Sequence, residues 1–395
     1  MSFSATTRGP AALPASLARV APPATAQSRL QSLDVLRGLT IVLMILVNQS
    51  GDLAHTYRPL VHSPWNGLTC ADVVFPCFLF IVGVSLVLSL NGRVERGLNP
   101  SELLHQAFKR AAILFVIGVA LNGLPSYHLA TLRFYGVLQR IAFCYFFAVS
   151  LYLWLKPRTL VLVTAAILVG YYVLLRWVSV PGYGMPGVDV PFLDPHGNLT
   201  AWIDRQIFSA SHLYLQGFYD PEGLLSSLPA LASTLIGVLA GIELLQHKAS
   251  SLRWTFLAGA SCLALGLLWS PWFPLNKRLW TSSFVLVNAG ISLMALGLLR
   301  WWLDGHSDRG RALEPFRIFG INALTAYIFS DIVTVLLSSV RLPHTDMALR
   351  RWLFQPVPTF LPNRYVAGLV CAIVYVGLCF LPVWLLYRRR IYLKV

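Results

Sequence analysis

The stretch VVFPCFLFIVGVSLVLSL, residues 73–90, decides the class of this fold. It holds no charged side chain, and about 20 apolar residues are what a helix needs to cross the hydrocarbon core of a bilayer. A helix satisfies all of its backbone N–H and C=O groups within one such segment. We therefore predict that this stretch is a transmembrane helix.

Similar apolar runs recur along the whole chain. Hydrophobic residues make up 56% of the 395 residues and charged residues only 12%, which is about half the charged fraction of a soluble globular protein. The sequence therefore predicts an all-α polytopic membrane protein with about ten transmembrane helices in one bundle. The predicted spans are 39–50, 73–90, 111–124, 136–155, 160–178, 224–245, 256–269, 283–303, 316–339 and 366–387.

The basic residues predict the orientation of these spans. If the N-terminus is cytoplasmic, the connections on the cytoplasmic side carry roughly twice as many Lys and Arg residues as those outside. Both termini are then expected to be cytoplasmic, which agrees with an even number of spans. The net charge of +15 indicates this topology and contact with anionic membrane lipids. Because no basic stripe is interleaved with exposed aromatic residues, no nucleic-acid partner is expected.

The chain divides into a tail and one membrane domain. Residues 1–28, rich in Ala, Pro, Ser and Thr, are predicted to form a flexible cytoplasmic tail, and residues 29–395 form the membrane domain. The long outer loop 181–223 contains a candidate amphipathic segment at 202–214, and it is either functional or surface filler. The six cysteines lie mostly in apolar runs, so neither a disulfide framework nor a metal site is predicted.

A cluster of polar residues precedes the stretch 73–90. In HSPWNGLTCAD the side chains of His62, Trp65, Asn66 and Asp72 gather beside the membrane surface. An imidazole that titrates near neutral pH, with a carboxylate or amide to fix its tautomer, is suited to general acid–base chemistry. An interfacial tryptophan belt with a solvated histidine explains the same residues equally well. Asp72 either orients His62 or caps the second span.

The first span carries polar groups at both ends. Asp34 and Arg37 lie three residues apart on one helical face at its cytoplasmic end, and Asn48 closes its outer end. The charged pair is either a topology anchor or a receptor for a phosphate, which the planar guanidinium suits. At 1.5 Å per residue, the segment from Asp34 to Asn48 spans roughly 21 Å.

Further charged residues are predicted on the outer side. Arg133 lies at an outer mouth, Asp220 and Glu222 precede the sixth span, and Lys277 precedes the eighth. Capping or snorkelling accounts for each of these alone. Arg140 is different, because an arginine two turns inside a span needs a partner or a water-filled cavity.

Six motifs then carry a resemblance. They are SLDVLRGLTIVLMILVN, HSPWNGLTCADVVFPCFLFIVG, GVLQRIA, YDPEG, PLNKRLWTSS and PFRIFGINALTAY. In this order they resemble the heparan-alpha-glucosaminide N-acetyltransferase family, from about Arg29 to the C-terminus. The family's members move an acetyl group from cytosolic acetyl-CoA to the amine of a glucosamine on the far side of the membrane.

The resemblance implies a set of roles. It makes His62 the active-site histidine, Asn48 the polar group beside it and Arg37 part of the coenzyme entrance. Together with the outer charges, it gives three groups of expected site residues: catalytic His62, Asn48 and Asp72; cofactor-binding Arg37, Asp34, Arg140 and Arg133; and substrate-binding Trp65, Asn66, Asp220, Glu222 and Lys277.

The implied reaction uses acetyl-CoA as donor. Neutral His62 acts as general base while Asn48 donates to the oxyanion, or alternatively His62 carries the acetyl group covalently. The lysosomal member has a long lumenal N-terminal domain that is missing here, so a free amino sugar or short amino-glycan is the expected acceptor. Similarity to bacterial members implies a bacterial inner membrane, and a homodimer is one expected assembly.

A different class of function stays open. Many helices with buried polar residues also describe an amino-sugar permease, although the sequence shows neither inverted halves nor helix pairs broken by Gly or Pro. The chain carries no Walker-type phosphate loop and no dinucleotide fingerprint, which argues against an ATP-driven pump.

Overall fold

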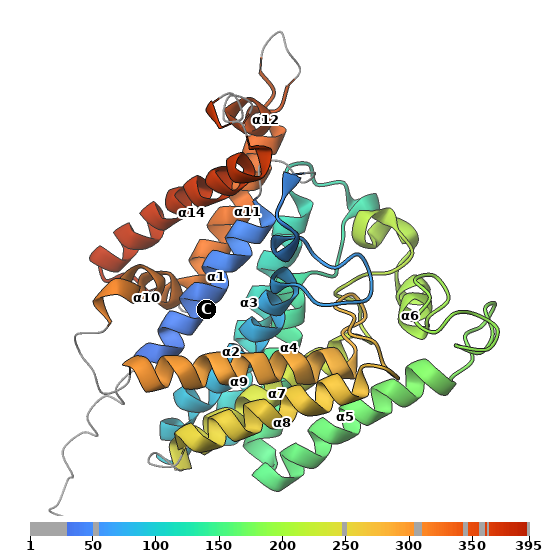
Figure 1. Cartoon of the computed structure of the whole chain (residues 1–395). Helices are drawn as coiled ribbons and strands as arrows, with labels where there is room; N and C mark the ends of the chain where they lie inside the picture. Colours follow the sequence, from blue (N-terminus) through green and yellow to red (C-terminus); the bar gives the residue numbers. More distant parts are fainter. Residues whose placement is uncertain are drawn as a thin grey trace, which may run out of the picture. The chain divides into compact units, whose positions relative to one another are not determined.

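The computed structural model describes residues 30–49, 55–246, 251–303, 310–342, 347–354, 360–361 and 363–392. The regular secondary structure of these residues is helical, with isolated β-bridges in place of a sheet (Figure 1). The predicted tail, residues 1–28, lies outside the described residues.

Nine of the described helices are long and apolar enough to cross a membrane, or ten spans if a bent pair is counted as one. They are α1 Gln31–Asn48, α2 Cys70–Val94, α3 Pro100–Gly123, α4 Val137–Trp154, α5 Pro157–Trp177, α7 Ser227–Gln246, α8 Ser251–Trp269, α9 Ser282–Leu303 and α14 Arg364–Arg388. The shorter helices are α6 Leu199–Ile207, α10 Glu314–Ile321, α11 Ala323–Ser339 and α12 Leu349–Phe354. The prediction of a multi-pass membrane protein with about ten spans is confirmed.

The predicted span 316–339 is not one helix. It breaks at Asn322 into α10 and α11, which meet at a bend of 74°. The run is apolar on both sides of the break, so hydropathy alone predicted a continuous helix, and the expectation that broken helix pairs are absent is wrong here. Beside the break, α10 packs closely against α1. A Cβ on Gly320 would stand 1.8 Å from the carbonyl oxygen of Asp34, so the two backbones touch.

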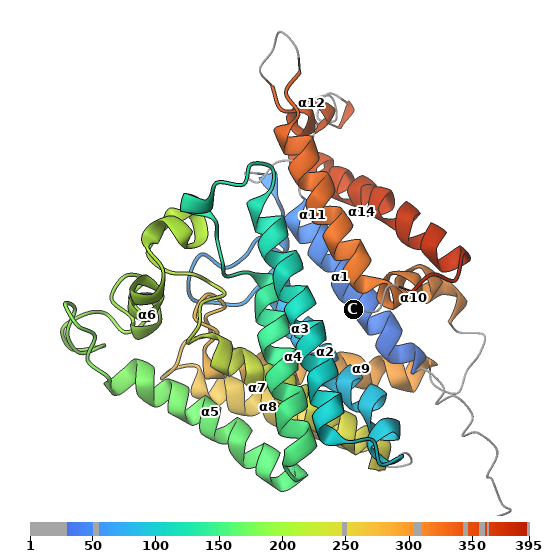
Figure 2. The ribbon, with the colours of Figure 1, turned by 180° about the vertical axis from the view of Figure 1, so that it is seen from behind.

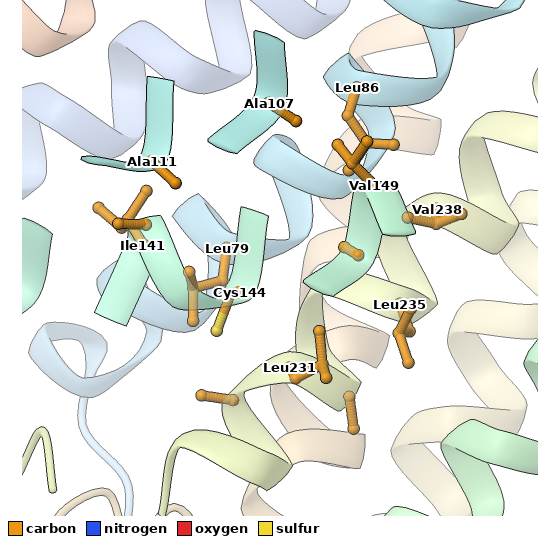
Figure 3. Close-up of a cluster of buried hydrophobic side chains, with 14 of the residues drawn as sticks. Leu79, Leu86, Ala107, Ala111, Ile141, Cys144, Val149, Leu231, Leu235 and Val238 are labelled. Atoms are coloured by element: carbon orange, nitrogen blue, oxygen red, sulfur yellow. The ribbon is translucent and has the colours of Figure 1, made fainter. Parts of the chain in front are cut away.

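The spans pack through small side chains, as expected where lipid removes the hydrophobic drive between helices. A Cβ on Gly83 of α2 would lie 2.0 Å from the carbonyl oxygen of Thr234 on α7, and one on Gly237 of α7 would lie 2.1 Å from that of Phe80. Figure 3 shows the apolar cluster around this crossing, to which α2, α3, α4 and α7 contribute. Its labelled members are Leu79, Leu86, Ala107, Ala111, Ile141, Cys144, Val149, Leu231, Leu235 and Val238.

Alternate connections between the spans contact one another on one side, which we call the loop face and define as residues 55–69, 124–136, 178–226 and 270–281. Side-chain contacts join them: Trp65 with Leu193, Arg133 with Asp220, His62 with Lys277, and Arg278 with Tyr219. On the opposite side Arg317 of α10 bonds Tyr387 of α14. Successive connections thus lie on opposite sides of the helices, as expected for a chain that crosses a membrane repeatedly (Figure 2).

Candidate active site

His62 and Asp72 form the centre of the loop face. Nδ1 of His62 lies 2.9 Å from Oδ1 of Asp72, whose side chain is fully buried, while the imidazole is 40% exposed. Since an ionised carboxylate only accepts hydrogen bonds, the imidazole donates through Nδ1. In the neutral ring this leaves the lone pair on Nε2, which is the arrangement that a general base needs.

The other carboxylate oxygen of Asp72 is held by the start of α2. Oδ2 accepts from the backbone N–H of Ser63 at 3.1 Å and from the N–H and hydroxyl of Thr69 at 3.1 and 3.0 Å. Thr69 and Asp72 thus form a capping box at the helix N-terminus, where the helix dipole also favours a negative charge. Asp72 therefore takes both of the positions that the sequence left open, beside His62 and at the helix cap.

Lys277 joins this pair from the connection between α8 and α9. Its Nζ lies 3.0 Å from Nδ1 and 3.1 Å from Nε2 of His62, and 3.8 Å from Oδ1 of Asp72. Because Nδ1 donates to the carboxylate, the ammonium donates to Nε2. Burial lowers the pKa of Lys277 to about 8, against the attraction of Asp72 and Glu222. The amine is thus much closer to its neutral form than a solvated lysine.

A short backbone pairing brings Lys277 to His62. Asn66 and Asn276 form an isolated antiparallel bridge, in which the N–H of Gly67 donates to the carbonyl of Leu275 at 2.7 Å. The amide of Asn276 donates to Oδ1 of Asn66 at 3.1 Å and accepts from the N–H of Leu279 at 2.9 Å. Asn66, predicted to bind substrate, is thus a connector between the two loops.

Arg133, Asp220 and Glu222 form a second charged cluster on the loop face. The guanidinium contacts Asp220 through Nε at 2.8 Å and Nη2 at 2.5 Å, and Nη2 also lies 2.5 Å from Glu222. Burial would lower the pKa of Arg133, but the two carboxylates raise it above its usual value. Burial would raise the pKa of Glu222, but Arg133 and Arg140 lower it, and Lys277 acts on it in the same direction. Glu222 therefore links this cluster electrostatically to Lys277.

Arg140 lies beneath the second cluster and is 2% exposed. Its Nη2 donates to Oγ of Ser226 at 2.5 Å and to the carbonyl of Gly223 at 3.3 Å, and its guanidinium stands 5.0 Å over the ring of Trp280. Within the described part of the chain, its Nε and Nη1 have no hydrogen-bond partner. The sequence predicted that Arg140 needs a partner. In the structure three groups serve: the Ser226 hydroxyl, the Gly223 carbonyl and the ring of Trp280.

Trp65 and Asn48 lie differently around His62. Nε1 of Trp65 donates to the carbonyl of Leu193 at 2.9 Å, and its ring meets Tyr219 edge-on at 5.3 Å, so it ties the first connection to the long loop. Asn48 is exposed at the end of α1. Among the contacts of the described residues there is none that joins Asn48 to His62.

Arg37 is bound at the other end of α1. Its Nη1 donates to Asp34 at 3.0 Å and to the carbonyl of Gly320 at 3.1 Å, and its Nη2 donates to Oγ of Ser85 at 2.8 Å. The predicted ion pair is present, and the same guanidinium also joins α1 to α2 and α10. Arg37 thus stands about one helix length from the loop face.

Asp204 is a buried acid that sequence reasoning missed. Its side chain accepts from the backbone N–H groups of Asp220 at 3.3 Å and Leu224 at 3.1 Å, and burial raises its pKa to about 7. It lies in α6, inside the segment predicted to be amphipathic. The sequence alone does not distinguish it from an acidic residue on the solvated face of such a helix. The Thr69–Asp72 capping box, in contrast, can be predicted from the sequence, because the pattern T-x-x-D stands directly before an apolar run.

Comparison with known proteins shows the family of this chain. The family profile "Heparan-alpha-glucosaminide N-acetyltransferase, catalytic" matches residues 29–266, which is more than half of the chain. The Homo sapiens heparan-alpha-glucosaminide N-acetyltransferase is 30% identical over 356 residues, covering 77% of this chain and 53% of the relative. The Mus musculus protein of the same name is 29% identical over 360 residues, covering 78% and 54%.

The chain spans about half the length of these relatives. The matched region includes α1 to α7, and with them His62, Asp72 and the Arg133 cluster. The chain belongs to the heparan-alpha-glucosaminide N-acetyltransferase catalytic-domain family.

Proposed function

We propose that this protein is a membrane N-acetyltransferase that moves an acetyl group from acetyl-CoA to the amine of a glucosamine-type acceptor at the loop face. The observation that carries the proposal is the contact of His62 with both Asp72 and Lys277 in a member of this family. We place the loop face outside and both termini in the cytoplasm, as the basic residues indicate. Similarity to bacterial members supports the bacterial inner membrane.

His62 acts as the general base. Its Nε2 removes a proton from the acceptor amine as that amine attacks the thioester carbonyl. Asp72 holds the tautomer through Nδ1 and stabilises the imidazolium that forms, while its bonds to the first turn of α2 fix the orientation of the ring. The competing mechanism, in which Nε2 itself takes the acetyl group and passes it on, uses the same geometry.

The charge that develops on the thioester oxygen needs a donor. Lys277 stands within 3.1 Å of Nε2 and in its ammonium form stabilises that oxyanion. Asn48, which is exposed at the C-terminal end of α1, is our candidate for a second hydrogen-bond donor to the oxyanion. Glu222 is the candidate to hold the acceptor's ammonium before deprotonation, because it lies at the Lys277 side of the second cluster. The carboxylate of Asp220 accepts hydrogen bonds from Arg133 and from the backbone N–H of Tyr214.

The donor enters from the opposite side of the membrane. We propose that coenzyme A phosphates dock near Asp34 and Arg37, where the phosphates exchange with the bonds that Arg37 makes in the free protein. The acyl arm then runs beside α1, a distance of roughly 21 Å, to the loop face. Arg133 and Arg140 are proposed to act at the acyl end, where Nε and Nη1 of Arg140 have no hydrogen-bond partner among the described residues.

One observation favours an amino-sugar permease as the second candidate. The broken pair α10 and α11, bent by 74°, resembles the discontinuous helices at the substrate sites of transporters. In a permease, the His62 cluster would bind and release the sugar without breaking a thioester.

Purified protein mixed with acetyl-CoA and glucosamine separates the two candidates. The acetyltransferase releases coenzyme A thiol and N-acetylglucosamine, and His62→Ala lowers both rates by about 10²–10⁴-fold. His128→Ala is the matched control, because His128 is an exposed histidine of the same loop face outside the cluster. Thiol release that is equal in wild type and His62→Ala, with uptake of unmodified sugar into vesicles, would establish the permease instead.

A further inference from the structure

Lys277 places a primary amine inside the proposed acyl-transfer centre. Its Nζ is 3.1 Å from Nε2 of His62, which is within the distance at which a general base removes a proton from an amine. The side chain is 20% exposed, and its Nζ also lies 3.8 Å from Oδ1 of Asp72. The Asn66–Asn276 bridge holds the backbone next to Lys277 beside the loop that carries His62.

We propose that Lys277 is itself an acetylation site, and that in the absence of acceptor its amine takes the acetyl group from the thioester that the site admits. The inference rests on the proposed function, since it uses the same donor and the same base. The product is an Nε-acetyl-lysine, an amide that this reaction cannot turn over.

The chemistry of this step balances without another reactant. His62 removes one proton from the Lys277 ammonium, and the neutral amine forms a C–N bond to the thioester carbonyl carbon. The C–S bond then breaks, and coenzyme A leaves as the thiol with the second proton of the amine. One acetyl-CoA is consumed for each lysine modified, and the remaining proton passes from His62 to solvent.

Burial makes the Lys277 amine easier to deprotonate than a solvated lysine. With its pKa lowered to about 8, about a tenth of the Lys277 amines are neutral at pH 7. A solvated lysine of ordinary pKa has only about 3 in 10,000 in that form. Lys109 lies in the N-terminal half of α3 and Lys156 at the start of α5, away from the loop face, and both are exposed. They serve as internal references for uncatalysed acetylation.

The modification changes the electrostatics of the site. Acetylation converts an ammonium beside Nε2 into a neutral amide and removes the charge assigned to the oxyanion. We therefore expect a protein left with acetyl-CoA but no acceptor to lose transfer activity as Lys277 becomes modified. Bound glucosamine protects it, because the acceptor amine occupies the position of attack.

Peptide mapping by mass spectrometry tests the inference on the full chain in detergent. The protein is incubated with isotopically labelled acetyl-CoA without sugar, and the acetyl content of the peptides holding Lys277, Lys109 and Lys156 is followed over time. Hydroxylamine treatment removes acetyl-imidazole and leaves the lysine amide. We expect hydroxylamine-stable label on Lys277 about a hundredfold faster than on the reference lysines, with a rate that rises about fivefold from pH 7 to pH 8 as the neutral fraction of the amine grows.

Two variants complete the test. His62→Ala is expected to slow the labelling of Lys277 to the rate of Lys109, and Lys277→Arg is expected to abolish label in that peptide. If His62→Ala does not fold, the ratio of Lys277 to Lys109 labelling in the wild type still decides. Equal labelling of the three lysines, or labelling of Lys277 that is indifferent to His62 in a folded variant, overturns the inference.

The two proposals fail in different ways. If N-acetylglucosamine forms while Lys277 stays unmodified, the proposed function stands and the self-acetylation is wrong. If neither sugar nor lysine is acetylated and no thiol appears, both are wrong. Lysine label without sugar acetylation retains the donor and the self-acetylation, and contradicts only the proposed acceptor.

Discussion

Asp72 joins His62 to the first turn of α2, with Oδ1 2.9 Å from the imidazole Nδ1 and Oδ2 3.1 Å from the backbone nitrogen of Thr69. A single carboxylate thus fixes both the tautomer of the base and the start of the helix that follows it. Orientation of the ring depends on a rigid transmembrane element and not on the loop that carries His62.

Substitution of Asp72 separates these two effects. Asp72→Asn keeps a capping side chain but offers Nδ1 of His62 an amide in place of a charge, so we expect acetylation to fall about 10²–10⁴-fold with a small change in melting temperature. Asp72→Ala loses the cap as well, which costs about 1 kcal/mol further. Steady-state rates and thermal melts of both variants check this. Full activity in a well-folded Asp72→Asn would refute the orienting role.

Lys277 predicts an alkaline limit to activity. If its ammonium stabilises the oxyanion, kcat/KM falls as pH rises through about 8, because that is where the lowered pKa removes the charge. Lys277→Arg keeps a cation at all accessible pH values, so the alkaline limb should move up by two pH units or so. Lys277→Met should be about 10²-fold less active than wild type below pH 8 and should show no alkaline limb at that pH. A limb that stays near pH 8 in Lys277→Arg would assign it to another group.

Asp204 predicts a pH dependence of stability. Burial raises its pKa from 3.8 to about 7, so between these values the folded chain holds a proton that the unfolded chain has released. The folded state binds more protons, and the free energy of unfolding therefore falls as pH rises from about 4 to 7 and is level above that. Asp204→Asn should flatten this dependence. Melting temperatures measured across the range would contradict the idea if wild type and variant run parallel.

Gly320 predicts coupling between helix packing and the coenzyme. A methyl group there would stand 1.8 Å from the carbonyl oxygen of Asp34, so Gly320→Ala must push α10 away from α1 and break the bond from Arg37 to the Gly320 carbonyl. We expect destabilisation of about 1–3 kcal/mol and a raised KM for acetyl-CoA. Gly377→Ala on α14, where nothing lies within 4 Å, is the control and should be neutral. An unchanged KM in Gly320→Ala would remove Arg37 from the coenzyme entrance.

The spans could be predicted from the sequence because a segment that crosses lipid must be a helix with apolar side chains. Each such segment therefore appears in the sequence as a long apolar run. The break at Asn322 was not predictable in the same way. The run there stays apolar, and beside the bend Gly320 contacts α1, which belongs to a distant part of the chain.

The site was predictable to the extent that it is local. His62 and Asp72 are ten residues apart and sit in a helix-start motif, so their proximity follows from the chain itself. Lys277 is 215 residues from His62, and Arg133 is 87 from Asp220, so those contacts depend on how the loops meet. A single sequence shows that charged residues are present in these loops, but it does not show which of them form contacts with one another.

The arrangement of Lys277 has a consequence for how the protein is made. A chain that has inserted α1 and α2 already carries the imidazole and its carboxylate, but the amine arrives only with the connection between α8 and α9. The Asn66–Asn276 bridge that closes the site forms at the same late stage. Assembly of the centre therefore requires synthesis past α8, and chains interrupted before that point lack the Lys277 amine.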